Sequence, residues 1–269
     1  MGGCRRGANT VRFDADLTEL DFLAEDLELG RFIAPHELPY FGESGTERAA
    51  RRERFRQRLH RDGWLSRGGG LRADFEELLR IWAEPEVVLT QVVNVVEAGR
   101  RLLYRGGWRG RTGVLTSQKG TVLSFGELRP AQVVDRLVGF LPDWEPVHGA
   151  PVTYVQVGGV HPGGPDHGEN FFGGIDAVPT NASGGPRAAE RFFTAPVVRA
   201  GAITCSVREP GTRTRRGREV EVGSLTWFDT TGGRFFLTTE TLSDGAERHT
   251  LTPADRARIA QWLRDRLNR

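Results

Sequence analysis

The chain has 269 residues, of which 38% are hydrophobic and 27% charged, so it can fold around a buried core. Its 37 basic residues are nearly balanced by 35 acidic ones, and this balance argues against a dedicated nucleic-acid binder. Two cysteines are too few for a disulfide framework or a structural zinc site. Because no apolar run is long enough to span a bilayer and no secretory leader is visible, the sequence predicts a cytoplasmic protein with no membrane partner.

The N-terminal part predicts one short strand followed by three helices. Asp16 and Glu19 have the spacing of a capping box, which predicts that the first helix begins there and ends at Gly30. The apolar residues of the third helix recur at helical spacing up to Trp82, and Pro85 ends it. The expected elements are a strand over 10–13 and helices over 16–30, about 46–60 and 75–85.

The second predicted helix is dense in arginine, and such a helix could contact nucleic-acid phosphates. All basic residues of the chain except Lys119 are arginines, which indicates a codon bias and not a special surface. Aromatic residues are not interleaved with the arginines as stacking platforms. We therefore interpret the helix as a solvated face and predict no nucleic-acid partner.

The period of the apolar residues changes after the third helix. Residues 86–96 are β-branched and apolar on both faces, which is typical of a central strand. A turn is expected over 97–99, and Pro130 suits the first turn of a helix that Pro142 ends. The further strands are expected over 100–108, 113–117, 121–125 and 152–157.

Glycine and proline dominate residues 158–186, which predicts a long loop or flexible insert. This segment holds the only cluster of metal-ligand residue types, namely His161, Asp166, His167 and Glu169. A segment of this composition cannot hold ligands in a fixed geometry without outside support. We therefore predict no metal site.

The C-terminal part predicts strands over 197–208, 223–228 and 234–239, an exposed hairpin tip over 209–218, and a last helix that begins at Thr252 and Pro253. Asp229 is expected in the turn of the last hairpin. Four aromatic residues flank that turn, namely Trp227, Phe228, Phe235 and Phe236. Alternation along the strands places one pair of them in a core and the other pair on the opposite sheet face. The second pair then needs a covering helix or a partner.

Two tetrapeptides recur in the same order. The stretch that starts at Gly113 resembles the one that starts at Gly223, and the stretch at Leu128 resembles the one at Leu251. Each time a hairpin precedes a helix that begins with proline. We infer two related α+β halves, residues 1–150 and 151–269, related by an approximate twofold axis.

Known catalytic signatures are missing. The sequence has no GxSxG elbow, no GxxxxGK[ST] phosphate loop and no HExxH helix, and the glycines after residue 157 do not open a helix as a dinucleotide site requires. We therefore expect no catalytic residue and no cofactor, and a protein that acts by binding another protein. An enzyme whose site is built from scattered residues is the alternative.

Several stretches resemble the EspG family of ESX (type VII) secretion-associated proteins of actinobacteria. They are residues 37–40 (ELPY), the Glu47-Arg48 helix start, residues 82–85 (WAEP), residues 223–234 (GSLTWFDTTGGR) and residues 252–255 (TPAD). The resemblance covers most of the chain, and the sequence departs from the family's pattern over residues 158–186. It implies a central, mainly antiparallel sheet with flanking helices in two quasi-symmetric halves, which is an α+β fold.

The resemblance also implies a cytosolic chaperone that binds and solubilises a PE/PPE-like secretion substrate heterodimer. We expect the chain itself to be a monomer or weak homodimer. The alternative is an adaptor that binds a component of the secretion machinery. In the family the contact surface includes the loop between the first long strand and its return. Here that loop comprises Val96, Glu97, Ala98, Gly99, Arg100 and Arg101.

Overall fold

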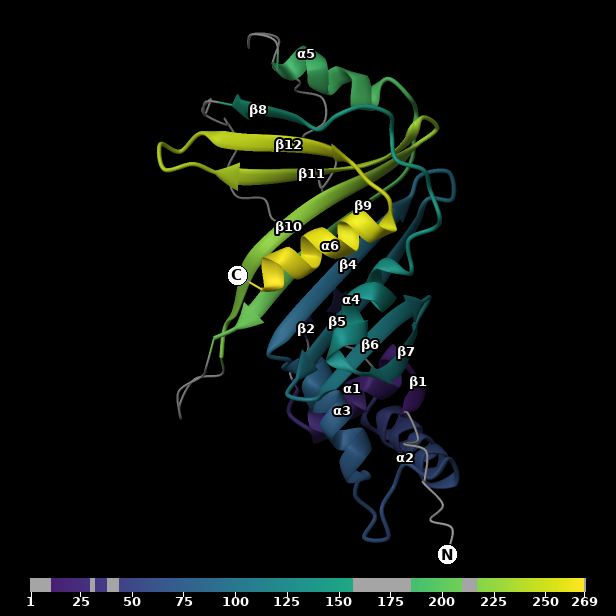
Figure 1. Cartoon of the computed structure of the whole chain (residues 1–269). Helices are drawn as coiled ribbons and strands as arrows, with labels where there is room; N and C mark the ends of the chain where they lie inside the picture. Colours follow the sequence, from purple (N-terminus) through teal and green to yellow (C-terminus); the bar gives the residue numbers. More distant parts are fainter. Residues whose placement is uncertain (1–10, 30–31, 38–43, 157–184, 210–216, 269) are drawn as a thin grey trace, which may run out of the picture.

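The computed structural model describes residues 11–29, 32–37, 44–156, 185–209 and 217–268, and one ten-stranded sheet runs through them. Its strands follow the order β1-β7-β6-β5-β4-β9-β10-β11-β12-β8, and every neighbouring pair is antiparallel (Figure 1). The α+β class with a central antiparallel sheet is therefore confirmed. The strands are β1 Arg12–Asp16, β4 Val87–Val95, β5 Arg100–Arg109, β6 Thr112–Lys119, β7 Val122–Leu128, β8 Val152–Gln156, β9 Val197–Arg208, β10 Glu219–Thr230, β11 Gly233–Thr241 and β12 Glu247–Pro253.

The sheet is symmetric in its connectivity about the central β4–β9 pair. On one side β4 leads through β5 and β6 to β7, and β1 forms the edge; on the other side β9 leads through β10 and β11 to β12, and β8 forms the edge. The stretches at Leu128 and Leu251 occupy equivalent places, each at the end of the fourth strand. The stretches at Gly113 and Gly223 do not, because β6 corresponds to β11 and not to β10. The division at residue 150 stays a prediction.

Three helices pack on one face of the N-terminal strands. They are α1 Leu17–Asp26, α2 Gly45–Arg61 and α3 Ala73–Ala83, and a two-stranded hairpin (β2 Phe32–Ile33, β3 His36–Glu37) lies between α1 and α2 in the chain. The predicted capping box of α1 is confirmed: Asp16 accepts from the backbone of Thr18 at 2.9 Å, and Glu19 accepts from the backbone of Asp16 at 3.0 Å. The apolar faces of these helices meet Phe13 and Phe125 of the sheet in one buried cluster.

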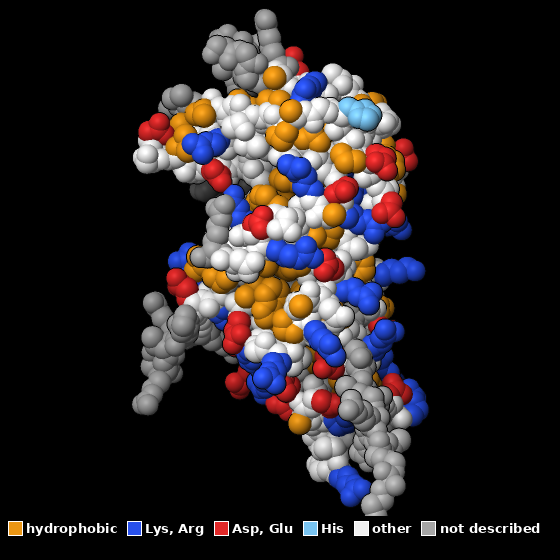
Figure 2. Space-filling model, viewed as in Figure 1, with side chains coloured by type: hydrophobic (Ala, Val, Ile, Leu, Met, Phe, Trp, Pro, Cys, Tyr) orange, Lys and Arg blue, Asp and Glu red, His pale blue; other side chains and the backbone are white. Residues whose placement is uncertain are grey.

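Two further helices, α4 Pro130–Val138 and α6 Arg256–Leu267, lie together on the opposite face of the sheet (Figure 1). Their apolar residues, including Leu137 and Leu263, join strand residues from both halves in a second cluster. Figure 2 shows hydrophobic side chains gathered on this face near the C-terminal end of α6. Leu267 of α6 is only partly buried against the cluster. The two helices thus tie the halves of the sheet together.

A third cluster covers the C-terminal strands from the other face. There α5 Gly185–Glu190 and the short 3-10 helix Arg191–Phe193 contribute Ala189 and Phe192. The expected alternation of the aromatic pairs is confirmed. Trp227 and Phe236 face each other across β10 and β11 in the cluster with α6, and Phe228 and Phe235 stack at 5.1 Å in the cluster with Phe192.

The structure corrects the predicted C-terminal elements. Thr252 and Pro253 do not start the last helix; they end β12, where they pair with β11, and Asp255 caps the helix instead. The sequence did not indicate β12, because most of its residues are polar. Asp229 lies within β10 and not in the turn.

Most of the predicted insert and of the hairpin tip over 209–218 fall outside the described residues. None of the helices in the described part of the chain has the length and apolar character needed to cross a membrane.

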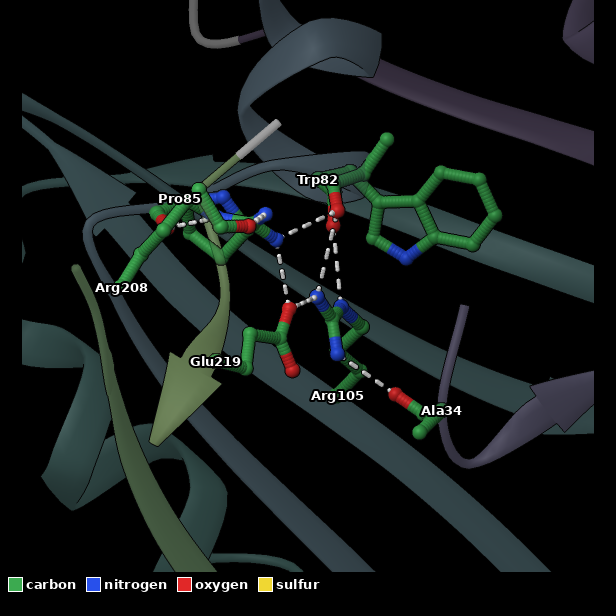
Figure 3. A network of polar contacts seen from close by, with 8 residues as sticks. Ala34, Trp82, Pro85, Arg105, Arg208 and Glu219 are labelled. Atoms are coloured by element: carbon green, nitrogen blue, oxygen red, sulfur yellow. Dashed lines mark hydrogen bonds and ion pairs between the residues drawn. The ribbon is translucent and has the colours of Figure 1, made fainter. Parts of the chain in front are cut away.

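A buried arginine connects the N-terminal helices to the C-terminal half (Figure 3). Arg105 of β5 is 2% exposed and donates to the carbonyl oxygens of Trp82 at 2.9 Å and Ala34 at 2.6 Å. Glu219, the first residue of β10, accepts from Arg105 at 3.1 Å and from Arg208 of β9 at 2.7 Å. Because the carboxylate lies between two guanidinium groups, it compensates the buried charge of Arg105.

The seam between the halves is the pairing of β4 with β9, and its tight packing predicts that Gly201 of β9 tolerates no larger residue. A Cβ on Gly201 would lie 2.4 Å from the carbonyl oxygen of Val92 and 2.9 Å from the indole of Trp227. Gly201→Ala should therefore lower the free energy of unfolding by about 2–3 kcal/mol, measured by urea denaturation. Gly126→Ala is the matched control, because its nearest contact is 4.0 Å away. Equal free energies of unfolding for the two variants would contradict the tight packing of this seam.

Candidate protein-binding site

The predicted site residues lie in the loop between β4 and β5 (residues 96–99) and at the first two positions of β5, Arg100 and Arg101. Val95 is the last residue of β4, and the backbone of Val96 donates to the carbonyl oxygen of Val198 at 3.2 Å. The backbone of Gly99 donates to the carbonyl oxygen of Val96 at 3.2 Å, and its φ of +54° suits glycine. The loop therefore lies beside the start of β9, at the end of the seam between the two halves.

This loop offers both apolar and charged groups to a partner. Val96 is 54% exposed, more than any other large hydrophobic residue in the described part of the chain. Arg100 pairs with Val95, and Arg101 pairs with Asn94, so the two arginines point to opposite faces of the sheet. Within the described ranges neither arginine forms an ion pair. Both charges are thus free to meet a partner.

A cavity of about 470 Å³ opens next to this loop, on the face that carries α4 and α6. Phe140, which follows α4 and is 41% exposed, forms part of its wall together with Leu102 and Tyr104 of β5. The sequence did not predict this cavity. Its lining residues come from segments far apart in the chain, and the only local signal was an aromatic residue just after the helical pattern ended.

The buried carboxylate of Asp229 is the strongest candidate for chemistry, and it is fully engaged. It is 0% exposed and accepts from Arg234 at 3.0 Å, while Arg199 forms an ion pair with it at 3.0 Å. Arg234 also donates to the carbonyl oxygen of Pro142 at 3.0 Å. Such a network holds β10, β11 and the segment after α4 in place, and it leaves the carboxylate no free lone pair directed to solvent.

The sequence profile of the EspG family matches residues 16–265. The chain belongs to the EspG family. Its fold is also similar to that in a solved structure, that of the Mycobacterium tuberculosis type VII secretion system chaperone EspG5 in complex with a PE25–PPE41 dimer. The TM-score is 0.57 and the identity 11%, over 96% of each chain. No curated protein matches the sequence. The structural likeness concerns the fold, and the profile match establishes the family.

In this EspG-family chain some of the arginines of α2 pair with carboxylates of α1. Arg48 pairs with Asp21 and, at 2.6 Å, with Glu25, while Arg58 pairs with Glu19 at 3.1 Å. These carboxylates belong to α1, so α2 is fastened to α1 by charge as well as by its apolar face. The interpretation of α2 as a phosphate-binding helix gains no support from this arrangement.

No group of three potential metal ligands comes together among the residues that the structure describes. The cluster around His161 and His167 lies outside those residues, as does Cys4. Cys205 of β9 is buried, and burial raises the pKa of its thiol to about 12. The thiol of this EspG-family protein therefore stays protonated at neutral pH and acts as a small apolar residue of the core.

His36 is a buried titratable residue whose pKa is lowered well below its usual value on folding. Its Nδ1 lies 3.0 Å from Gln118 Oε1 and its Nε2 3.2 Å from Thr116 Oγ1. Burial lowers the pKa of the His36 imidazole to about 4, and the nearby charge of Arg105 acts in the same direction. The ring is therefore neutral in the folded protein at neutral pH.

This shift predicts a pH dependence of stability. Between pH 6.5 and about 4 the unfolded chain binds a proton on this histidine that the folded chain does not. The free energy of unfolding should therefore fall by up to about 3 kcal/mol from this group as the pH is lowered through that window. Urea denaturation from pH 7 to 4.5 measures it. His36→Asn, whatever its stability at pH 7, should lose this part of the slope; an unchanged slope would contradict the assignment.

Proposed function

We propose that this chain is a chaperone of the type VII secretion system that binds a PE/PPE-like heterodimer in the cytoplasm and keeps it soluble. The observation that carries the proposal is the EspG-family profile, which matches nearly the whole chain. The similar EspG5 structure, which contains a PE25–PPE41 dimer, supports the kind of client. In this proposal the protein acts by binding its client and performs no chemical step.

We propose further that the client contacts the β4–β5 loop, from Val96 to Arg101. The exposed side chain of Val96 supplies apolar area, and the two unpaired arginines supply charge. The loop is fastened at its base by the β4–β5 ladder and by the hydrogen bond to Val198, so little ordering is needed when a partner binds. These features fit a preformed contact surface.

Co-expression with the PE–PPE pair encoded nearest to this gene tests the proposal. We expect the pair to be soluble and to co-elute with the chain in size-exclusion chromatography, and to aggregate when the chain is omitted. A client that stays insoluble, with no co-elution, would contradict the chaperone function. Recovery of the secretion ATPase without any PE–PPE pair would favour the adaptor.

The loop itself is tested by a charge in place of its apolar residue. Val96→Asp should weaken the complex at least about tenfold, because it puts a carboxylate where apolar area is buried. Val122→Asp is the matched control: Val122 is also an exposed valine, 38% accessible, and it starts β7 on the far side of the N-terminal half. Calorimetric titration with the purified client measures both. Equal affinities of the two variants would remove the loop from the interface.

A further inference from the structure

The cavity beside the β4–β5 loop has the composition of a specificity pocket, and this inference rests on the proposed function. Its volume of about 470 Å³ lies within the range of about 300–1,000 Å³ that is usual for small-ligand sites. Val93 and Val95 line it from β4, and Trp227 lines it from β10. Side chains of the sheet thus form the floor of the cavity, and the cavity lies next to the β4–β5 loop.

One wall consists of two stacked aromatic rings. The rings of Tyr104 and Phe140 lie 4.2 Å apart at an interplanar angle of 22°. Tyr104 is buried, whereas Phe140 is 41% exposed, so the stack presents an apolar surface that solvent reaches. Leu102 and Leu141 complete this wall. An apolar side chain that enters would bury surface against rings that are already fixed.

The charges around the cavity are of one sign. Its lining contains Arg100, Arg199 and Arg256 and no aspartate or glutamate. The carboxylate of Asp229 occupies one side of Arg199, whose guanidinium also lies over the ring of Trp144 at 4.5 Å.

The other two arginines are less constrained. Arg256 pairs with Asp143, whose side chain is 96% exposed, so solvent weakens this pair. Arg100 has no ion-pair partner in the described part of the chain. The carboxylates near the cavity thus offset the charges of Arg199 and Arg256 but not that of Arg100. The rim of the apolar cavity is therefore positive, and Arg100 is the group most free to bind an anion.

We propose that this cavity accepts an apolar side chain of the PE–PPE client that has a carboxylate next to it, with Arg100 binding the carboxylate. The apolar walls select the side chain, and the unpaired guanidinium group of Arg100 selects the acidic neighbour. Arg100 belongs both to the cavity and to the β4–β5 loop, so the cavity continues the proposed client surface. The client's charge, and not only its apolar area, then determines which partner binds.

Variants of the full chain, titrated with the purified PE–PPE client by calorimetry, provide the first arm of the test. Arg100→Glu and Phe140→Ala should each weaken binding at least about tenfold, and the effect of Arg100→Glu should shrink as salt is raised. Arg111→Glu, an equal charge change at the exposed turn between β5 and β6, should leave the affinity unchanged. Arg101→Glu, on the opposite sheet face, should weaken it less than Arg100→Glu. Thermal unfolding checks that each variant is folded.

The second arm needs no client. Anilinonaphthalene sulfonate, an apolar aromatic anion that fluoresces when it leaves water, is titrated into the purified chain. We expect Arg100→Glu and Phe140→Ala each to lose a binding site that the wild type and Arg111→Glu retain. This probe measures the chemistry of the cavity independently of the client.

The two arms separate the possible failures. If both variants bind the client and the probe like the wild type, the cavity does not take apolar anions and the inference is wrong. If the probe is lost but the client binds normally, the cavity is not part of the client interface, and the inference is again wrong while the chaperone function stands. If the wild type binds no client, the proposed function fails and the client role of the cavity with it.

Discussion

The pairing of β4 with β9 is the interaction on which the rest of the structure depends. Nine residue pairs, from Val87 with Val207 to Val95 with Arg199, join the two halves into one sheet. Both strands are central in the sheet: β4 also pairs with β5, and β9 also pairs with β10. The close approach at Gly201, where Trp227 lies across the backbone, makes this seam intolerant of added volume. The helices α4 and α6 then cover a face that exists only because the halves are joined.

Two polar networks secure the ends of this seam. At one end Glu219 lies between Arg105 and Arg208, which also bind carbonyl oxygens near the end of α3. At the other end Asp229 lies between Arg199 and Arg234. In each network a carboxylate of β10 compensates two arginines, so the charges are satisfied where strands from different parts of the chain meet.

The proposed client surface is a product of this arrangement. The β4–β5 loop lies at the end of the seam, and the cavity next to it takes Arg100 and Phe140 from the N-terminal half and Arg199 and Arg256 from the C-terminal half. Neither half alone would form the cavity. Binding of a client should therefore depend on the relative position of the halves, which the β4–β9 ladder sets.

The sequence by itself determined many of the local elements and the family. Periodicity, caps and prolines were sufficient for the start of α1, which ends at Asp26 and not at Gly30, and for α3, α4 and the strands from β4 to β7, because these signals act within a few residues. Aromatic alternation around Trp227 predicted two covered faces for the same reason. Tertiary structure alone decided that Thr252 and Pro253 pair in a strand, and that Asp229 is buried between arginines. It also brought Arg100, Phe140, Arg199 and Arg256 around one cavity. These contacts join residues far apart in the chain, and no short-range pattern records which distant segments will meet.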